Sequence, residues 1–183
     1  TNGLVDLTMS YTVTSGALLL LAACLCDSAS DRNPVVTSSL DTMTLLAEAL
    51  GGASGQGCAV FYKINPTVGT HTLTFGTDNA SSTDFIQGIA VTFNAVDTAT
   101  PYDGQQTATG SVAALSLTIT TATGNLVVDF AAVNGVPVIT VGADQPQRAN
   151  FGTGSSTTGL MSTQAGASGG AMFEACVFCW SSS

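Results

Sequence analysis

The sequence predicts an all-β protein: one antiparallel β-sandwich, jelly-roll-like, with about ten to twelve strands in two sheets. Short apolar or alternating runs recur along the whole chain, and each ends at a break rich in Gly, Pro, Asn or Ser. No amphipathic helix separates these runs, whereas a parallel α/β fold needs such helices. At 183 residues the chain is long enough for one sizeable core and too short for two comfortable ones. Residues 1–183 are therefore expected to form a single domain.

The first quarter of the chain predicts four strands. Residues 4–14 alternate apolar and polar side chains, which predicts a half-buried strand. Residues 17–26 are apolar on both faces, so they are expected to form a central strand that is buried between two layers. Residues 35–38 predict a short strand. Residues 42–48 predict another, although their Leu, Ala and Glu residues also suit a helical turn.

The middle of the chain predicts three strands and one long turn. Residues 58–64 and 70–75 are expected to run across a turn at Asn65-Pro66, and the second of them alternates Thr with apolar residues. Residues 85–96 predict a long strand in which Gly88 marks a bulge. The polar residues 97–110 predict a segment of turns.

The rest of the chain predicts five more strands. Residues Ala122, Thr123 and Gly124 form the turn of a hairpin, and Asn134-Gly135 is a strong hairpin signal that leads into the next strand. Residues 142–156 predict a loop. The five strands are expected at residues 112–120, 125–133, 136–141, 157–164 and 171–180.

Charge is sparse in this chain. Only 8% of its residues are charged, against roughly a quarter in an ordinary soluble domain. Lys63, Arg32 and Arg148 are its only basic residues, and the net charge is −9. Such a chain cannot neutralise phosphates, so nucleic acid and anionic membranes are not expected as partners. No apolar run reaches the ~20 residues of a membrane span.

Five cysteines leave three interpretations open. Cys24 and Cys26 are two residues apart on one predicted strand, so their side chains face the same side. Cys176 and Cys179 are three apart and face opposite sides, and Cys58 begins a strand. Buried apolar thiols are favoured by these strand contexts, and one or two disulfides or a Cys₄ zinc site are the alternatives. The odd number leaves at least one thiol free or paired between chains.

Residues that could carry chemistry are few. His71 is the only histidine, and no Gly-x-Ser-x-Gly elbow or nucleophilic cysteine context accompanies it, so it is expected to be a plain strand residue. Two loops gather oxygen-bearing side chains that Ca²⁺ accepts, without the spacing of a Ca²⁺ loop. They contain Asp27, Asp31 and Asn33 in one case and Asp78, Asn79 and Asp84 in the other. The sequence therefore predicts no enzyme and no catalytic, cofactor or metal site.

Aromatic residues are candidates for a carbohydrate-binding platform, because Trp and Tyr rings stack on sugars. The candidates are Tyr11, Tyr62, Phe173, Phe178 and Trp180. Alternation along the last predicted strand places Phe178 and Trp180 on one face and Val177 on the other. Packing in the core is expected for at least one of these faces.

Four segments in order resemble a known family. They are Tyr11-Thr-Val-Thr-Ser-Gly16 and residues 62–74, 90–101 and 120–129, which include the patterns Asn-Pro-x-x-Gly-x-His-Thr-Leu-Thr and Thr-x-x-Gly-Asn-Leu-Val-Val-Asp. This set is similar to a widespread family of jelly-roll-like β-sandwich domains in tailed-phage virion proteins and bacterial exported surface proteins. The similarity extends from about residue 9 to residue 180. One departure is the Leu run directly after Gly16 and Ala17, where the family has a polar residue or two.

The resemblance implies function without implying site residues, because the family is not a catalytic one. Its phage members imply a non-enzymatic virion protein that decorates or cements the outer surface of a tailed-bacteriophage capsid. The expected partners are the major capsid protein or another virion protein and further copies of the chain, with a trimer favoured. The acidic charge favours the outer face of the capsid. The alternative is an exported bacterial carbohydrate-binding or adhesion module, located outside the cell or at its surface.

Overall fold

The strand β2 (Leu19–Asp27) lies at the centre of the fold in the computed structural model. The structure describes residues 6–27, 33–51, 56–78, 85–110, 124–134, 146–152, 157–165 and 173–180. Each side chain from Leu19 to Cys26 is inaccessible to solvent. The sequence explains this burial, because the strand offers apolar side chains to both of its faces.

Twelve strands and no helix make up the described part of the chain. None of the described segments is a helix of the length and apolar character that crossing a membrane would need. Besides β2, the strands are β1 (Leu7–Val13), β3 (Pro34–Ser38), β4 (Thr44–Leu50), β5 (Gln56–Ile64), β6 (Gly69–Thr77), β7 (Phe85–Phe93), β8 (Tyr102–Gly110), β9 (Leu126–Asn134), β10 (Gln147–Gly152), β11 (Thr157–Ala165) and β12 (Phe173–Trp180).

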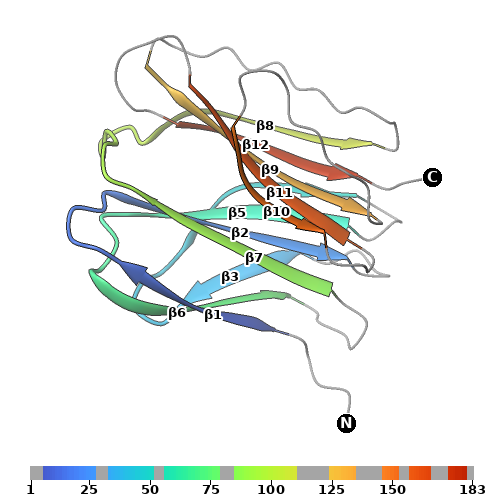
Figure 1. Ribbon diagram of the computed structural model, residues 1–183, viewed down its shortest axis with the longest axis horizontal. Coiled ribbons are helices and arrows are strands. Elements are labelled where there is room, and N and C mark those ends of the chain that lie inside the picture. The colour runs from blue at the N-terminus through green and yellow to red at the C-terminus, as the bar shows by residue number, and fades with distance from the viewer. Residues whose placement is uncertain are drawn as a thin grey trace.

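The strands form three sheets that stack on one another (Figure 1). The outer sheet has the order β1-β6-β3, the central sheet β4-β5-β2-β7, and the C-terminal sheet β10-β11-β9-β12-β8. The first seven strands cross repeatedly between the outer and central sheets, as strands of a jelly roll cross between its two sheets. The last five strands form the C-terminal sheet.

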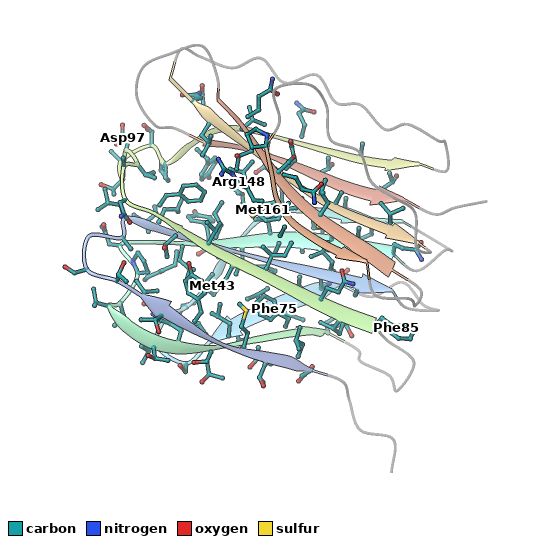
Figure 2. All side chains as sticks on the ribbon, viewed as in Figure 1. Met43, Phe75, Phe85, Asp97, Arg148 and Met161 are labelled. Atoms are coloured by element: carbon teal, nitrogen blue, oxygen red, sulfur yellow. The ribbon has the colours of Figure 1, made fainter. Side chains whose placement is uncertain are left out.

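The core has two layers, one on each face of the central sheet. On one face, Leu21 and Leu25 of β2 pack with Phe130 of β9 and Met161 of β11. On the other face, Ala22 and Cys24 pack with Leu73 and with Phe75, which Figure 2 labels between the outer and central sheets. Fully burying one Leu side chain contributes about 1.5–3 kcal/mol. The odd and even positions of a single strand therefore hold both layers together.

The predicted all-β sandwich is confirmed, and so is the predicted place of residues 17–26 between two layers. The number of sheets differs, because the structure has three where the sequence predicted two. Pairing is antiparallel except at β12, which runs parallel to both β8 and β9. Strand alternation alone cannot distinguish two sheets from three, since a central sheet needs only that both of its faces be apolar.

The sequence analysis did not predict two of the strands, and the structure decides between strand and helical turn for residues 42–48. Strand β8 lies in the segment predicted as turns, and β10 lies in the predicted loop 142–156. Both are edge strands among the described residues; β8 is mostly polar and exposed, and β10 begins with the exposed Gln147 and Arg148, so neither shows the apolar alternation that marks a strand. Residues 42–48 are a strand and not a helical turn. The predicted strands at 112–120 and 136–141 lie outside the described residues.

The bulge predicted at Gly88 is absent, because β2 and β7 pair without a shift in register. Glycine is needed there for a different reason. A Cβ atom at position 88 would lie 2.5 Å from Cδ2 of Phe75, closer than van der Waals contact allows. The close approach of β7 to this fully buried ring therefore requires a residue without a side chain.

We expect Gly88→Ala to lower the free energy of unfolding by about 1–3 kcal/mol, because the new methyl group overpacks the core against Phe75. Urea unfolding followed by circular dichroism measures the change. Gly104→Ala in β8 is the matched control, because a Cβ there meets no atom within 4 Å. It is expected to change stability by less than about 0.5 kcal/mol. Equal effects of the two substitutions would contradict this account of Gly88.

Candidate functional site

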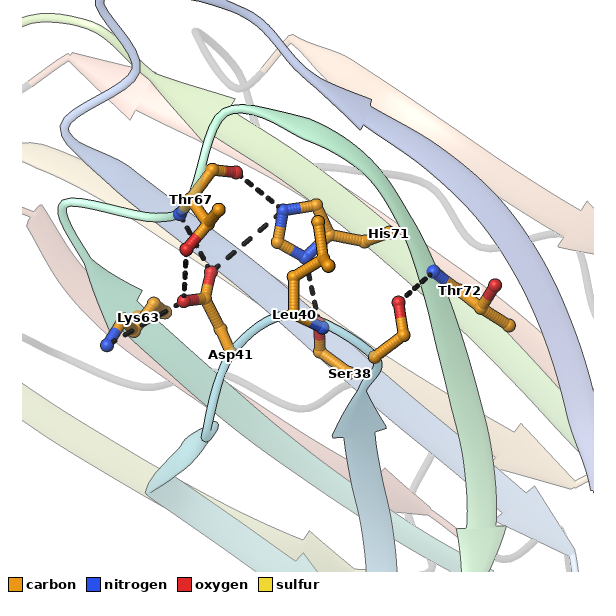
Figure 3. Close-up of polar contacts among 8 residues, drawn as sticks. Ser38, Leu40, Asp41, Lys63, Thr67, His71 and Thr72 are labelled. Carbon is orange, nitrogen blue, oxygen red and sulfur yellow. Dashed lines mark hydrogen bonds and ion pairs between the residues drawn. The ribbon is translucent and has the colours of Figure 1, made fainter.

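The single histidine lies where the loop after β3 and the turn after β5 meet β6 (Figure 3). His71 is fully buried. Its Nδ1 atom lies 2.8 Å from Oγ of Ser38, and its Nε2 atom lies 2.7 Å from the carbonyl oxygen of Thr67. Because a carbonyl oxygen only accepts, Nε2 carries the donated proton, and in the neutral ring Nδ1 accepts from the Ser38 hydroxyl.

Asp41 completes this cluster from the loop between β3 and β4. Its carboxylate accepts from the backbone N–H of Thr67 at 2.9 Å and from the Thr67 hydroxyl at 2.9 Å. Nζ of Lys63 lies 3.9 Å from Oδ1 of Asp41, and Nε2 of His71 lies 3.9 Å from Oδ2, which is too far for a hydrogen bond. Thr67 is thus held through its N–H, its hydroxyl and its carbonyl.

Local backbone chemistry explains why the turn between β5 and β6 presents Thr67 in this way. Asn65 adopts a left-handed conformation with φ of 48°, which Asn tolerates better than most residues, and Gly69 has φ of 141°. Pro66 between them is buried. The pattern Asn-Pro-x-x-Gly-x-His is therefore a turn that is closed by its own histidine four residues after Thr67.

Ser38 and His71 have the geometry of a hydroxyl beside a general base. The sequence did not predict this pair, because Ser38 stands in no nucleophile motif. The imidazole is fully buried, and its Nε2 already donates to Thr67. The Ser38 hydroxyl also accepts from the N–H of Leu40 at 3.4 Å. These hydrogen bonds connect β3, β6 and two connecting loops, which is a structural role.

A groove of about 510 Å³ opens where β1, β7 and β10 meet, each an edge strand of a different sheet. Apolar side chains from all three sheets line it, among them Met9, Val91 and Met161. Arg148 of β10 lies at this groove beside Met161 (Figure 2), and its Nε donates to the hydroxyl of Thr163 at 2.8 Å. Of the aromatic residues that the sequence offered as candidates, Tyr11 lines this groove.

The aromatic platform suggested by the sequence is not assembled from Tyr11 and Tyr62. Tyr11 lies on the outer sheet, where its hydroxyl is 3.2 Å from Oγ1 of Thr92. Tyr62 lies on the central sheet and meets Tyr102 edge to face, with ring centroids 5.7 Å apart. Burial, and then the neighbouring Tyr102, raise the pKa of Tyr62. The side chains of Phe173, Phe178 and Trp180 lie outside the described residues.

The interpretation of the cysteines as buried thiols is confirmed for Cys24, Cys26 and Cys58, whose side chains are all buried. Burial, and then the neighbouring Cys26, raise the pKa of the Cys24 thiol, so it stays protonated and behaves as a small apolar group. Cys24 faces the outer sheet, away from the sheet that contains β12. This placement contradicts a Cys₄ zinc site shared with Cys176 and Cys179, whose side chains lie outside the described residues.

The acidic loops form turn contacts wherever they are described. Asp78 accepts from the backbone N–H of Asn33 at 3.1 Å and from its side-chain amide at 2.7 Å. These two bonds join the loop that contains Asn33 to the loop that contains Asp78. The side chains of Asp27, Asp31, Asn79 and Asp84 lie outside the described residues. Within the described part, no three His, Cys, Asp or Glu side chains gather as metal ligands do.

A further turn contact lies between β7 and β8, in the segment that belongs to the resemblance. Asp97 accepts from the N–H of Ala99 at 2.8 Å and from the hydroxyl of Thr100 at 3.0 Å. The bond from Ala99, followed by those from Thr100, lowers the pKa of Asp97. The carboxylate therefore fixes a turn, as short polar residues commonly do.

Comparison with protein-family models, with curated proteins and with solved structures finds no match for this chain.

We expect Asp41→Ala to lower the free energy of unfolding by about 1–3 kcal/mol, because it leaves the Thr67 turn without its buried acceptor. Thermal and urea unfolding measure the loss. Asp78→Ala is the control, since it also removes a carboxylate that accepts two hydrogen bonds, but at an exposed site where water replaces it. If both substitutions lower the free energy of unfolding equally, the contacts of Asp41 do not stabilise the fold more than an exposed turn contact does.

Proposed function

We propose that this chain is a non-enzymatic structural protein that decorates the outer surface of a tailed-phage capsid as an oligomer. The observation that carries the proposal is the state of the sheet edges. Monomeric β-proteins protect edge strands with charged side chains, especially Lys, or with Pro, because an open edge pairs with other strands. This chain has long edges with little of that protection.

Among the strands that the structure describes, the six at the edges of the three sheets are β1, β3, β4, β7, β8 and β10. Together they carry three charged residues, Glu48, Asp103 and Arg148, and one proline, Pro34. The only lysine of the chain, Lys63, lies on β5, which is an interior strand. Edges of this kind suit a protein whose edges are covered in an assembly.

Charge and the polar clusters support the rest of the proposal. A net charge of −9 suits the outer face of a capsid better than the face that meets packaged DNA. His71, Asp41, Asp78 and Asp97 hold turns and loops together, so these groups serve the fold. The resemblance to virion β-sandwich domains supports the same function.

We expect the purified protein to be a stable oligomer, with a trimer favoured, and to bind capsids. Light scattering measures its mass, and co-sedimentation with capsids assembled from the major capsid protein of the same genome measures binding. Saturable binding to the capsid is the expected result. A monomer that stays in the supernatant contradicts the proposal, as does ester hydrolysis that Ser38→Ala abolishes.

The double substitution Gln105→Lys with Thr107→Lys tests the β8 edge within the same experiment. Both residues are exposed on this edge strand, so lysines there should block strand pairing and shift the oligomer towards monomer. The control lies in the loop between β7 and β8, where Thr98→Lys with Ala99→Lys adds the same charge at exposed positions outside any strand. Equal dissociation by both pairs would assign the effect to charge alone.

A second function has one observation in its favour, namely carbohydrate binding by an exported module. Tyr102 is 41% exposed, and its ring is supported edge to face by Tyr62. An exposed aromatic ring that a neighbour holds in place is a suitable stacking surface for a sugar.

If the chain binds carbohydrate, we expect Tyr102→Ala to weaken glycan binding about tenfold or more, because the stacking surface is lost. A glycan array identifies the sugar, and calorimetry measures its affinity. Phe85→Ala is the matched control, because Phe85 is similarly exposed, at 46%, and lies on another sheet. An array without any specific signal removes this second function.

A further inference from the structure

The groove beside β7 follows the edge of the strand and not one of its faces. Side chains alternate between the two faces of a strand, so a pocket over one face meets every second residue. Here the consecutive residues Gly88, Ile89, Ala90 and Val91 all line the groove. Among the described strands, β7 pairs with β2 alone, and its other edge faces the groove.

The shape of the groove selects an extended segment as its occupant. Met9 and Tyr11 of β1 stand on one side of β7, and Arg148 and Ala149 of β10 stand on the other. The β7 edge is therefore recessed between two walls. The β7 edge of a second copy is recessed in the same way, so two such edges cannot meet. Strand addition needs room for only one polypeptide strand about 5 Å from the sheet edge, and the backbone of that strand can continue the ladder of the central sheet.

Charge selects the side chain that this segment carries. Arg148 is the only charged residue in the described lining of the groove, in a chain whose net charge is −9. Its Nε donates to Thr163, which orients the guanidinium, and among the described residues no hydrogen bond or ion pair occupies its terminal amino groups. Guanidinium groups bind carboxylates through two parallel hydrogen bonds. The groove thus offers a cation in an otherwise acidic protein.

We propose that this groove binds an extended segment of a partner protein, which adds as a strand to the edge of β7 and places an Asp or Glu side chain on Arg148. Apolar residues that alternate along the segment pack against Met9, Val91 and Met161. This inference goes beyond the proposed function, since a groove of this kind binds its segment whether or not the chain coats a capsid.

The test begins with a displayed library of random octapeptides selected on the immobilised full-length protein. We expect enriched peptides to alternate apolar residues and to contain Asp or Glu. Arg148→Gln should weaken binding of an enriched peptide about tenfold or more, because a charge-assisted hydrogen bond is lost. Lys63→Gln is the matched control, because it removes the same charge at Asp41, outside the groove lining, and it should leave the affinity unchanged.

Methylation of the peptide backbone tests strand addition without any change to the protein. In an added strand, alternate N–H groups of the peptide face β7, so N-methylation of one alternate set should abolish binding while methylation of the other set is tolerated. Equal effects of the two sets overturn strand addition. The proposal is also overturned if selection enriches no peptide, if the enriched peptides lack acidic residues, or if Arg148→Gln and Lys63→Gln have equal effects.

Discussion

Burial of β2 on both faces is the constraint on which the rest of the structure depends. A strand whose residues 19–26 are all inaccessible to solvent needs a layer on either side, so the central sheet has to be covered twice. The outer sheet covers the face of Cys24, and the C-terminal sheet covers the face of Leu21 and Leu25. Two apolar layers then form in a chain of 183 residues, and charged side chains have no place in either layer.

The same stacking determines where binding surfaces can occur. Both faces of the central sheet are occupied by the core, so its backbone is accessible at the edge strands β4 and β7. At β7, the flanking edges β1 and β10 turn the edge into a groove. On the C-terminal sheet, the edge strand β8 carries exposed Tyr102. The surfaces available for partners thus follow from the order of strands more than from any local motif.

Sequence patterns predicted the strands whose own apolar side chains determine which of their faces are buried. The apolar run 17–26 predicted a central strand, and β6 alternates as expected, with Leu73 and Phe75 buried. The polar strand β8 could not be predicted, because an exposed edge has no apolar face to mark it. The site residues Ser38, Asp41 and Arg148 were also missed. Each acts through a contact with a residue distant in sequence, and such contacts exist only once the sheets have formed.

The segments behind the family resemblance have a structural role wherever the structure describes their polar contacts. Asn65, Gly69 and His71 shape and close one turn, and Asp97 fixes another through Ala99 and Thr100. Residues that build turns constrain the fold in any protein that shares it, whatever that protein binds. A resemblance based on them therefore supports the β-sandwich more strongly than it supports a partner. Contacts with a particular partner would have to form at exposed side chains outside these turns, such as Arg148 beside β7.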